Sequence, residues 1–174
     1  MRTATGIAVA VLGGLLSGCG DAASEQDRQS TVHFTAPEFA IDVPGHPKQG
    51  KQTVSTGAGP VEITTYTVTL ENSMVTMLVV PVPEDAGVNL DDGIDGVVRD
   101  VSGHLEDSES IEYDGFEGRD ARITAELQGN EVTAFTRILA IDGALLQLLN
   151  VVNDADLEQP PESWNRMLDS LEIG

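Results

Sequence analysis

Two segments of the chain are apolar at nearly every position, and they constrain its fold more than any other feature. One runs from Met74 to Val80 and stops at Pro81 and Pro83, and the other occupies residues 144–152. A strand with one solvated face alternates apolar and polar residues, whereas a strand covered on both faces does not. Both segments therefore predict central strands of a sheet that is buried on both sides.

The segments around them predict further strands joined by short turns. Residues 34–44 alternate apolar and polar positions before a break that contains proline and glycine. Residues 61–70 are rich in β-branched types, and their apolar positions change phase, which predicts a β-bulge near Thr64 and Thr65. Three more strands are expected at 109–113, 120–127 and 132–141, with turns at Asp114-Gly115, Gly129-Asn130 and Asp142-Gly143.

Two segments have helical periodicity. Apolar residues recur at helical spacing from Leu90 to Leu105, with aspartates in the early turns and Gly103 as the expected stop. A second helix begins at Pro160-Pro161 and carries an apolar stripe from Trp164 to Leu171. Hairpin connections imply an antiparallel sheet, and the two fully apolar strands need cover on both faces. We therefore expect an α+β fold in which helices flank both faces of an antiparallel sheet, an α/β/α sandwich.

The amino terminus has the pattern of a secretory signal. Residues 7–16 are apolar, about half the roughly 20 residues that a membrane-spanning helix needs. Leu16-Ser17-Gly18-Cys19 follows, and it resembles the lipobox of bacterial lipoproteins. The resemblance implies attachment of a diacylglyceryl group to the Cys19 sulfur and cleavage between Gly18 and Cys19. The alternative is an ordinary signal peptide followed by an incidental cysteine.

Cys19 is the only cysteine, so the chain forms no intrachain disulfide, and lipidation gives this lone thiol a purpose in an exported protein. Two or more acyl chains on one residue anchor a protein stably. We expect a signal peptide at 1–18, a lipidated cysteine with a flexible tether at 19–31, and a single domain at 32–174. The domain would lie outside the cytoplasm, anchored to the cell membrane or to an outer membrane where one is present.

The charge of the chain restricts its partners. The formal net charge is −20, and Lys48 and Lys51 are the only lysines. Nucleic-acid binding needs a basic footprint, so we expect no nucleic-acid partner. A soluble acidic surface is the simplest interpretation, and binding of cations or of a basic partner is the alternative.

Motifs for metal binding or catalysis are incomplete. Residues 154–158 (Asp-Ala-Asp-Leu-Glu) look like the start of a calcium loop, but Gln159 replaces the required glycine and Asn165 the bidentate glutamate. His33, His46 and His104 form no pair with zinc-ligand spacing. No Gly-x-Ser-x-Gly motif is present to expose a nucleophilic serine. We therefore predict no catalytic residue, no metal site, no cofactor and no enzymatic activity.

Three arginines stand out in so acidic a chain. Arg119 and Arg137 fall on adjacent predicted strands, while Arg122 has the opposite side-chain parity to Arg119. The first interpretation is cross-strand pairing with Asp120, Glu126 or Glu131. The second is contact with an anion or carboxylate at an exposed sheet edge.

The order of elements supports a family resemblance. The sequence opens with Phe-x-Ile-x-Val-Pro-Gly-x-Pro at 39–47 and closes with Trp-x-x-Met-Leu-Asp-Ser-Leu at 164–171. Over residues 34–173 it resembles the PsbP-like domains, named for an extrinsic subunit of photosystem II. The resemblance implies an accessory or binding module rather than an enzyme. No functional residue of the family maps onto a position here, so the ligand-binding residues are unknown.

These observations favour a membrane-anchored lipoprotein that acts as a binding or accessory module for a protein partner in the cell envelope. The alternative is a carrier for a small ligand, namely a lipid, a sugar or a cation. A cavity lined by Tyr66, Met77, Phe135 or Trp164 would favour the carrier. A fully packed core would favour the partner-binding module.

Overall fold

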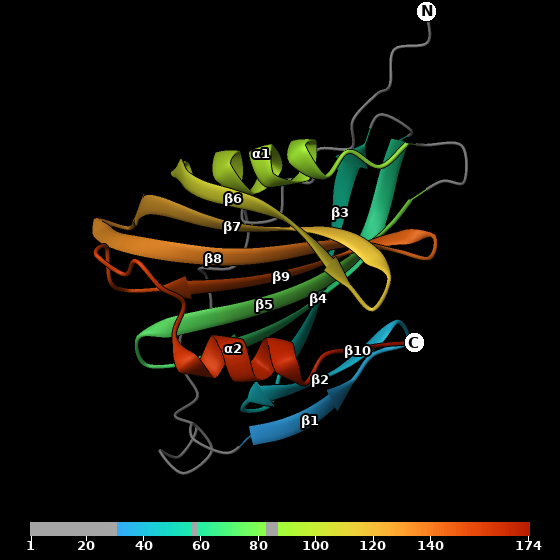
Figure 1. Cartoon of the computed structure of the whole chain (residues 1–174), viewed down its shortest axis with the longest axis horizontal. Helices are drawn as coiled ribbons and strands as arrows, with labels where there is room; N and C mark the ends of the chain where they lie inside the picture. Colours follow the sequence, from blue (N-terminus) through green and yellow to red (C-terminus); the bar gives the residue numbers. More distant parts are fainter. Residues whose placement is uncertain (1–30, 57–58, 83–86) are drawn as a thin grey trace, which may run out of the picture.

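The computed structural model describes residues 31–56, 59–82 and 87–174, which form two antiparallel sheets and two helices (Figure 1). The large sheet has seven strands in the order β3-β4-β5-β9-β8-β7-β6, and the small sheet has the order β1-β2-β10. The strands are β1 (Thr31–Thr35), β2 (Phe39–Pro44), β3 (Lys48–Thr56), β4 (Gly59–Thr69), β5 (Ser73–Pro81), β6 (His104–Tyr113), β7 (Phe116–Leu127), β8 (Asn130–Ile141), β9 (Ala144–Val152) and β10 (Glu172–Ile173). The helices are α1 (Leu90–Asp100) and α2 (Glu162–Asp169). The predicted signal peptide, Cys19 and the tether up to residue 30 lie outside the described residues.

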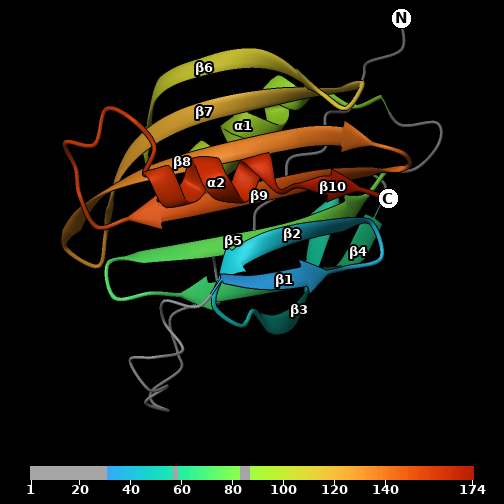
Figure 2. The ribbon, with the colours of Figure 1, turned by 60° about the horizontal axis from the view of Figure 1, so that its bottom comes forward.

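The large sheet is covered on both faces by different kinds of layer. Helix α1 lies on one face, against β7 and β8, with Ile94 and Val97 buried beneath it. On the opposite face, α2 and the small sheet lie side by side (Figure 2). There Trp164 of α2 and Phe39 of β2 join one apolar cluster. The chain therefore has one core on each side of the large sheet.

The expected α/β/α sandwich is wrong, because this is a β-rich fold. Within the described residues the two helices have only 11 and 8 residues, whereas ten strands make up most of the structure. Part of the layer opposite α1 is the small sheet, whose strand β2 buries Phe39, Ile41 and Val43. An apolar sheet face needs cover, but a strand pair with one apolar face can supply that cover as well as a helix can.

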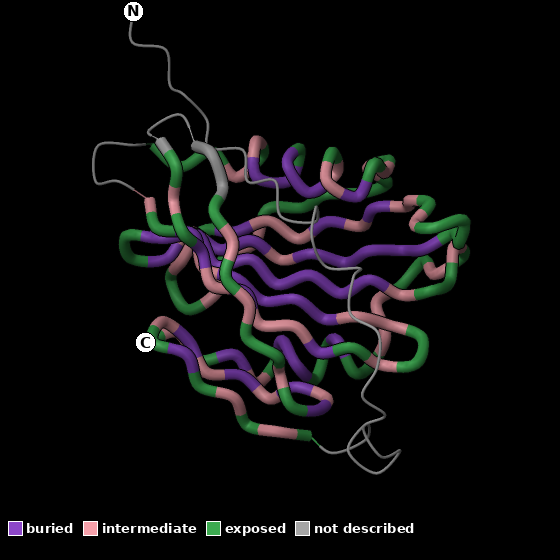
Figure 3. Tube along the Cα trace, turned by 180° about the vertical axis from the view of Figure 1, so that it is seen from behind, coloured by how far each residue is buried: buried purple, intermediate pink, exposed green. Residues whose placement is uncertain are grey.

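The two central strands are where the sequence predicts them. Strand β5 pairs with β4 and β9, and β9 pairs with β5 and β8, so both have neighbours on each side. Every residue from Ala144 to Val151 is buried, which shows as a continuous buried stretch through the middle of the sheet (Figure 3). The strands from β7 to β9 also agree with the expected hairpins.

The predicted bulge near Thr64 and Thr65 is wrong. Strand β4 keeps a continuous register with both β3 and β5 through these residues. Ile63 is buried in the core under α1, whereas Val68 is buried in the core on the other face. The apolar residues change phase because both faces of β4 are covered, and no extra residue is inserted.

Some element boundaries also differ from those expected. The segment 34–44 is split between two strands, β1 and β2. Strand β3 was not predicted, because its sequence lacks an apolar period. Helix α1 ends at Asp100, and Leu105 belongs to β6 because Ser102 adopts a left-handed backbone with φ of 50°. The turn between β7 and β8 is centred on Gln128 and Gly129, both with positive φ, one residue earlier than expected.

No helix in the described ranges is long and apolar enough to cross a bilayer.

Candidate binding site at the edge of the large sheet

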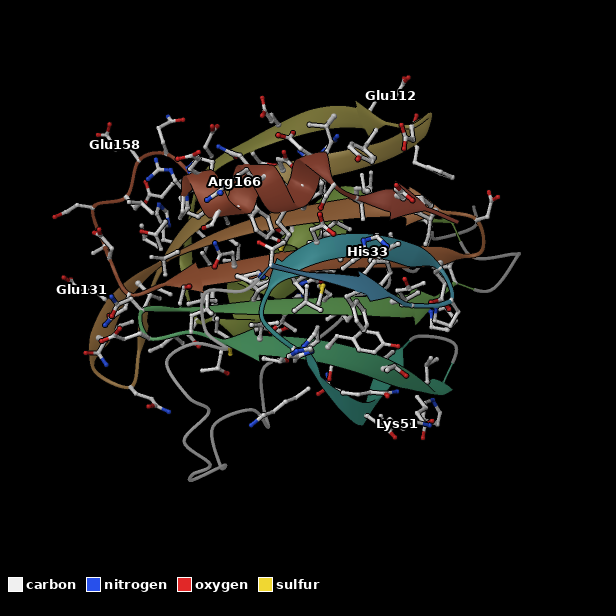
Figure 4. All side chains as sticks on the ribbon, turned by 90° about the horizontal axis from the view of Figure 1, so that it is seen from below. His33, Lys51, Glu112, Glu131, Glu158 and Arg166 are labelled. Atoms are coloured by element: carbon white, nitrogen blue, oxygen red, sulfur yellow. The ribbon has the colours of Figure 1, made fainter. Side chains whose placement is uncertain are left out.

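Strand β6 forms one edge of the large sheet and is its most acidic strand. It pairs with β7 on one side, and within the described ranges no strand pairs with its other side. Every residue from Glu106 to Ser110 is exposed, so side chains on both faces of the strand reach solvent. We call the carboxylates of this strand the acidic edge: Glu106, Asp107, Glu109 and Glu112. Glu112 projects outward on the opposite side of the molecule from Lys51 of β3 (Figure 4).

A hollow lies beside the acidic edge on the face that carries α1. Its volume is about 450 Å³, and it opens to solvent. We call it the α1 hollow; its lining comes from the start of α1 and from β6 and β7, and includes Asn89, Asp91, Ser110, Glu112, Glu117 and Arg119. Asn89 caps the helix, since its side chain accepts a hydrogen bond of 3.1 Å from the Asp91 backbone N–H. Val88, an exposed large apolar residue, lies at its rim.

Arg119 is fixed within the α1 hollow by two neighbours. Its Nε donates to Asp91 Oδ1 over 2.8 Å, and its Nη1 donates to Ser110 Oγ on the adjacent strand. Its side chain is only 25% exposed, whereas that of Asp91 is 70% exposed. The carboxylates of Glu112 and Glu117 lie directly opposite each other on β6 and β7 in the same hollow. The hollow therefore keeps an excess of negative charge.

A second hollow lies beside the acidic edge on the opposite face of the sheet. It has a volume of about 170 Å³ and lies between β6, β7 and the segment that leads into α2. We call it the α2 hollow; its lining includes Asp107, Glu109, Asp120, Arg122, Phe135, Glu158 and Trp164. The buried rings of Phe135 and Trp164 contribute apolar surface between these charged groups. This combination suits the binding of a long polar side chain, whose aliphatic part can pack against the rings while its polar end contacts the charged groups.

The arginines of this face differ in their partners. Arg137 makes a bidentate pair with Asp120, with Nε–Oδ1 at 2.8 Å and Nη2–Oδ2 at 2.6 Å, and its guanidinium carbon lies 5.5 Å from the Tyr113 ring centre. Tyr113 in turn donates to the Leu171 carbonyl over 2.5 Å, which ties the end of β6 to the segment after α2. Arg122 is half-buried in the α2 hollow, and its guanidinium makes no hydrogen bond or ion pair with any described residue.

The predicted cross-strand pairing of the arginines holds for one of them. Arg137 and Asp120 are direct neighbours on β8 and β7, as the sequence interpretation required. Arg119 instead reaches Asp91 of α1, a contact between residues 28 positions apart that sequence parity does not reveal. Glu126 and Glu131 lie opposite each other and pair with no arginine of the described structure. Arg122 is the arginine left for the alternative, contact with an anion or carboxylate, but its strand β7 lies one strand in from the sheet edge.

The residues considered for metal binding are dispersed. Asp154 Oδ1 accepts a hydrogen bond from the Asp156 backbone N–H over 3.1 Å, which is a local turn contact. His33 contacts Asp42 at 2.8 Å on the small sheet, and His46 and His104 lie exposed on other segments. Within the described residues, no three His, Cys, Asp or Glu side chains come close enough together to hold a metal ion.

The four residues proposed to line a carrier cavity are packed instead. Met77 is fully buried, and Tyr66 lies against Phe34 and Phe39 with ring centres 4.7 and 6.3 Å away. Phe135 and Trp164 are also buried in this core, and both contribute to the lining of the small, acidic α2 hollow.

Comparison with solved structures identifies the fold. Cyanobacterial PsbP (CyanoP) from Synechocystis is 16% identical, with a TM-score of 0.57 over 91% of this chain and 99% of that protein. A protein from Bacteroides thetaiotaomicron is 7% identical, with a TM-score of 0.50 over 84% of this chain and 49% of that one. LpqN of Mycobacterium tuberculosis, involved in cell envelope biogenesis, is 15% identical, with a TM-score of 0.46 over 83% of this chain and 89% of its own.

At these identities the likeness concerns the fold alone, and at that level the PsbP-like resemblance is confirmed. No protein-family model matches the chain, and no curated protein sequence matches it.

Proposed function

We propose that this protein is a membrane-anchored accessory lipoprotein that works outside the cytoplasm, binds another protein and catalyses no reaction itself. The lipobox at Leu16–Cys19 supports the anchor, and the PsbP-like fold supports the accessory role. The likeness to PsbP and the secretory signal both fit an extracytoplasmic location. Fold alone does not fix function, so the choice between a partner-binding module and a carrier depends on where the molecule has space for a ligand.

The observation that carries the proposal is the filled space between the large sheet and α2. Met77, Leu139 and Leu148 have no exposed surface there, and Trp164 closes the layer from the helix side. Side chains buried in this way leave no room for a lipid or sugar among them. The hollows described above lie at the surface beside an uncovered strand, which suits binding to another macromolecule.

A direct test is to cross-link the full-length protein in its native membrane and identify the attached proteins. The Cys19→Ser variant is the matched control, because it keeps the domain and removes the thiol that would carry the lipid. We expect one dominant protein partner for the native chain, metabolic labelling with a fatty-acid probe at Cys19, and loss of label and membrane retention in the variant. Recovery of the native chain with a small ligand and no protein partner would support the carrier instead.

A further inference from the structure

The uncovered side of β6 is a long sheet edge. The strand has ten residues, and its outer backbone N–H and C=O groups pair with no other strand of the described structure. Such a row of groups can accept an additional strand from another chain. The strand contains no proline or lysine, and its one irregularity, between Leu105 and Asp107, lies near its start. The stretch from Ser108 to Tyr113 is therefore regular and available.

The hollows on the two faces fit the geometry of an added strand. Successive side chains of a strand point to opposite faces of the sheet. On β6, Ser110 and Glu112 line the α1 hollow, whereas Asp107 and Glu109 line the α2 hollow. A strand paired to the outer side of β6 would direct its side chains alternately toward these two hollows. Specificity in strand addition comes from places for alternate side chains of this kind.

The charge of the site selects a basic segment. Arg119 in the α1 hollow is already engaged by Asp91, and Asp120 in the α2 hollow is already engaged by Arg137. The remaining carboxylates of the two hollows have no arginine or lysine partner among the described residues: Asp107, Glu109, Glu112, Glu117 and Glu158. Lysine or arginine side chains entering from an added strand would neutralise them, and the buried rings of Phe135 and Trp164 would contact their aliphatic stems.

A second copy of this chain is a poor occupant. Pairing β6 with another β6 would bring two sets of four carboxylates together, and like charges across strands are destabilising. The opposite edge, β3, carries Lys48 and Lys51, but Lys51 already contacts Glu62 at 2.7 Å. The net charge of −20 also repels a second copy at long range. The acidic edge therefore disfavours self-association and favours a basic partner.

We propose that β6 binds an extended, basic segment of a partner protein as an eighth strand of the large sheet, with alternate lysine or arginine side chains in the α1 and α2 hollows. The inference rests on the proposed function, since it names the chemistry and the binding mode of the partner.

The test uses the full-length lipoprotein in detergent micelles and a synthetic ten-residue peptide in which Lys-Lys and Thr-Thr pairs alternate, so that an added strand presents lysines on both of its faces. The control peptide is identical but N-methylated at its amides, so it keeps the charge and loses the backbone donors. We expect the first peptide to slow amide hydrogen exchange within residues 104–113, and the N-methylated peptide to bind at least about tenfold more weakly, because strand addition depends on backbone hydrogen bonds. Equal binding of the two peptides, or protection confined to β3, would overturn the proposal.

Protein variants separate the acidic edge from the overall charge. Glu109→Lys and Glu112→Lys should each weaken binding of the lysine peptide by about three- to tenfold, the range expected when a charge at an interface is reversed. Glu71→Lys, on the turn between β4 and β5, changes the net charge equally and should leave binding within about twofold. Glu112→Lys also relieves the like-charge pair with Glu117, so loss of folding does not explain its effect.

If all three variants weakened binding of the lysine peptide equally, the proposal would be overturned. It would also be overturned if the native protein formed concentration-dependent dimers that Glu112→Lys abolishes. The outcome is separable from that of the membrane cross-linking. If a cross-linked partner bound both β6 variants as well as the native protein, the strand addition would be refuted, whereas the accessory role would still be supported. Peptide addition at β6 without any cross-linked protein in the membrane would support the edge as a site and remove the accessory role.

Discussion

Arg137 and Asp120 face each other across β8 and β7 and form a bidentate ion pair in which the arginine side chain is only 14% exposed. The Tyr113 ring lies against the same guanidinium, so this pair joins three adjacent strands, β6, β7 and β8. Removing one partner of such a pair leaves a charge in a poorly solvated place. Arg137→Leu should therefore lower the free energy of unfolding by about 2 kcal/mol, measured by urea titration.

The exposed pair Lys51–Glu62 is the control for this prediction. Its side chains are 60% and 63% exposed, so solvent screens the pair and Lys51→Met should leave the unfolding free energy almost unchanged. A double-mutant cycle on Asp120 and Arg137 should give a coupling of about 1–2 kcal/mol. A coupling near zero would show that the bidentate pair contributes no net stability.

Gly118 marks the closest approach of β7 to its surroundings. A Cβ built there would lie 2.5 Å from Leu139 Cδ2 and 2.7 Å from the Ile138 carbonyl oxygen. The backbone carbonyl cannot move without disturbing the pairing of β7 with β8. Gly118→Ala should therefore destabilise the protein by about 1–3 kcal/mol in thermal or urea unfolding. Gly87→Ala, where nothing lies within 4 Å, is the matched control and should change stability by less than about 0.5 kcal/mol.

Local patterns predicted the strands well but not the layers. The uninterrupted apolar run of β9 identifies a central strand because only a doubly covered strand has this composition. The same pattern does not say what covers the strand. Phe39, Ile41 and Val43 indicate a strand with one apolar face, yet nothing local reveals that this face packs on the large sheet instead of extending it. The α/β/α expectation failed at that step.

The candidate site was less predictable because it depends on contacts between distant segments. Once β7 and β8 are known to pair, the alternation of side chains along each strand puts Arg137 and Asp120 on the same face. The sequence could therefore predict this pair. The α2 hollow brings Arg122 on β7 beside Glu158 and Trp164, more than 30 positions later in the chain. Strand β6 was expected to begin only at residue 109, because Leu105 continued the helical spacing of the preceding segment. Its full length as an open edge follows only from the tertiary structure.

Calcium should have no effect on this domain. The aspartates of 154–158 make local turn contacts, and Asp91 is occupied by Arg119. A bound ion stabilises the folded state in proportion to its affinity, so a specific site raises the melting temperature. We expect identical melting temperatures in EDTA and in millimolar calcium, measured by differential scanning calorimetry. A clear calcium-dependent rise would point to a site that these contacts do not reveal.

The two tyrosines predict how stability changes at alkaline pH. Burial raises the pKa of Tyr113, the charge of Asp114 raises it further, and Arg137 opposes this rise. Burial, followed by the charge of Glu38, raises the pKa of Tyr66. A phenol whose pKa is higher in the folded state keeps its proton longer there than in the unfolded chain. Its contribution is complete below the unfolded pKa of about 10 and is lost as the pH rises through the folded pKa.

Stability should therefore fall above about pH 10, and Tyr113→Phe should make that fall shallower. At neutral pH the same variant should be less stable by about 1 kcal/mol, because the hydroxyl no longer donates to the Leu171 carbonyl. The chain has only these two tyrosines, so near-ultraviolet titration of Tyr66→Phe reports the ionisation of Tyr113 alone. A titration midpoint at the value of a free tyrosine would show that the packing of Tyr113 against α2 does not persist in solution.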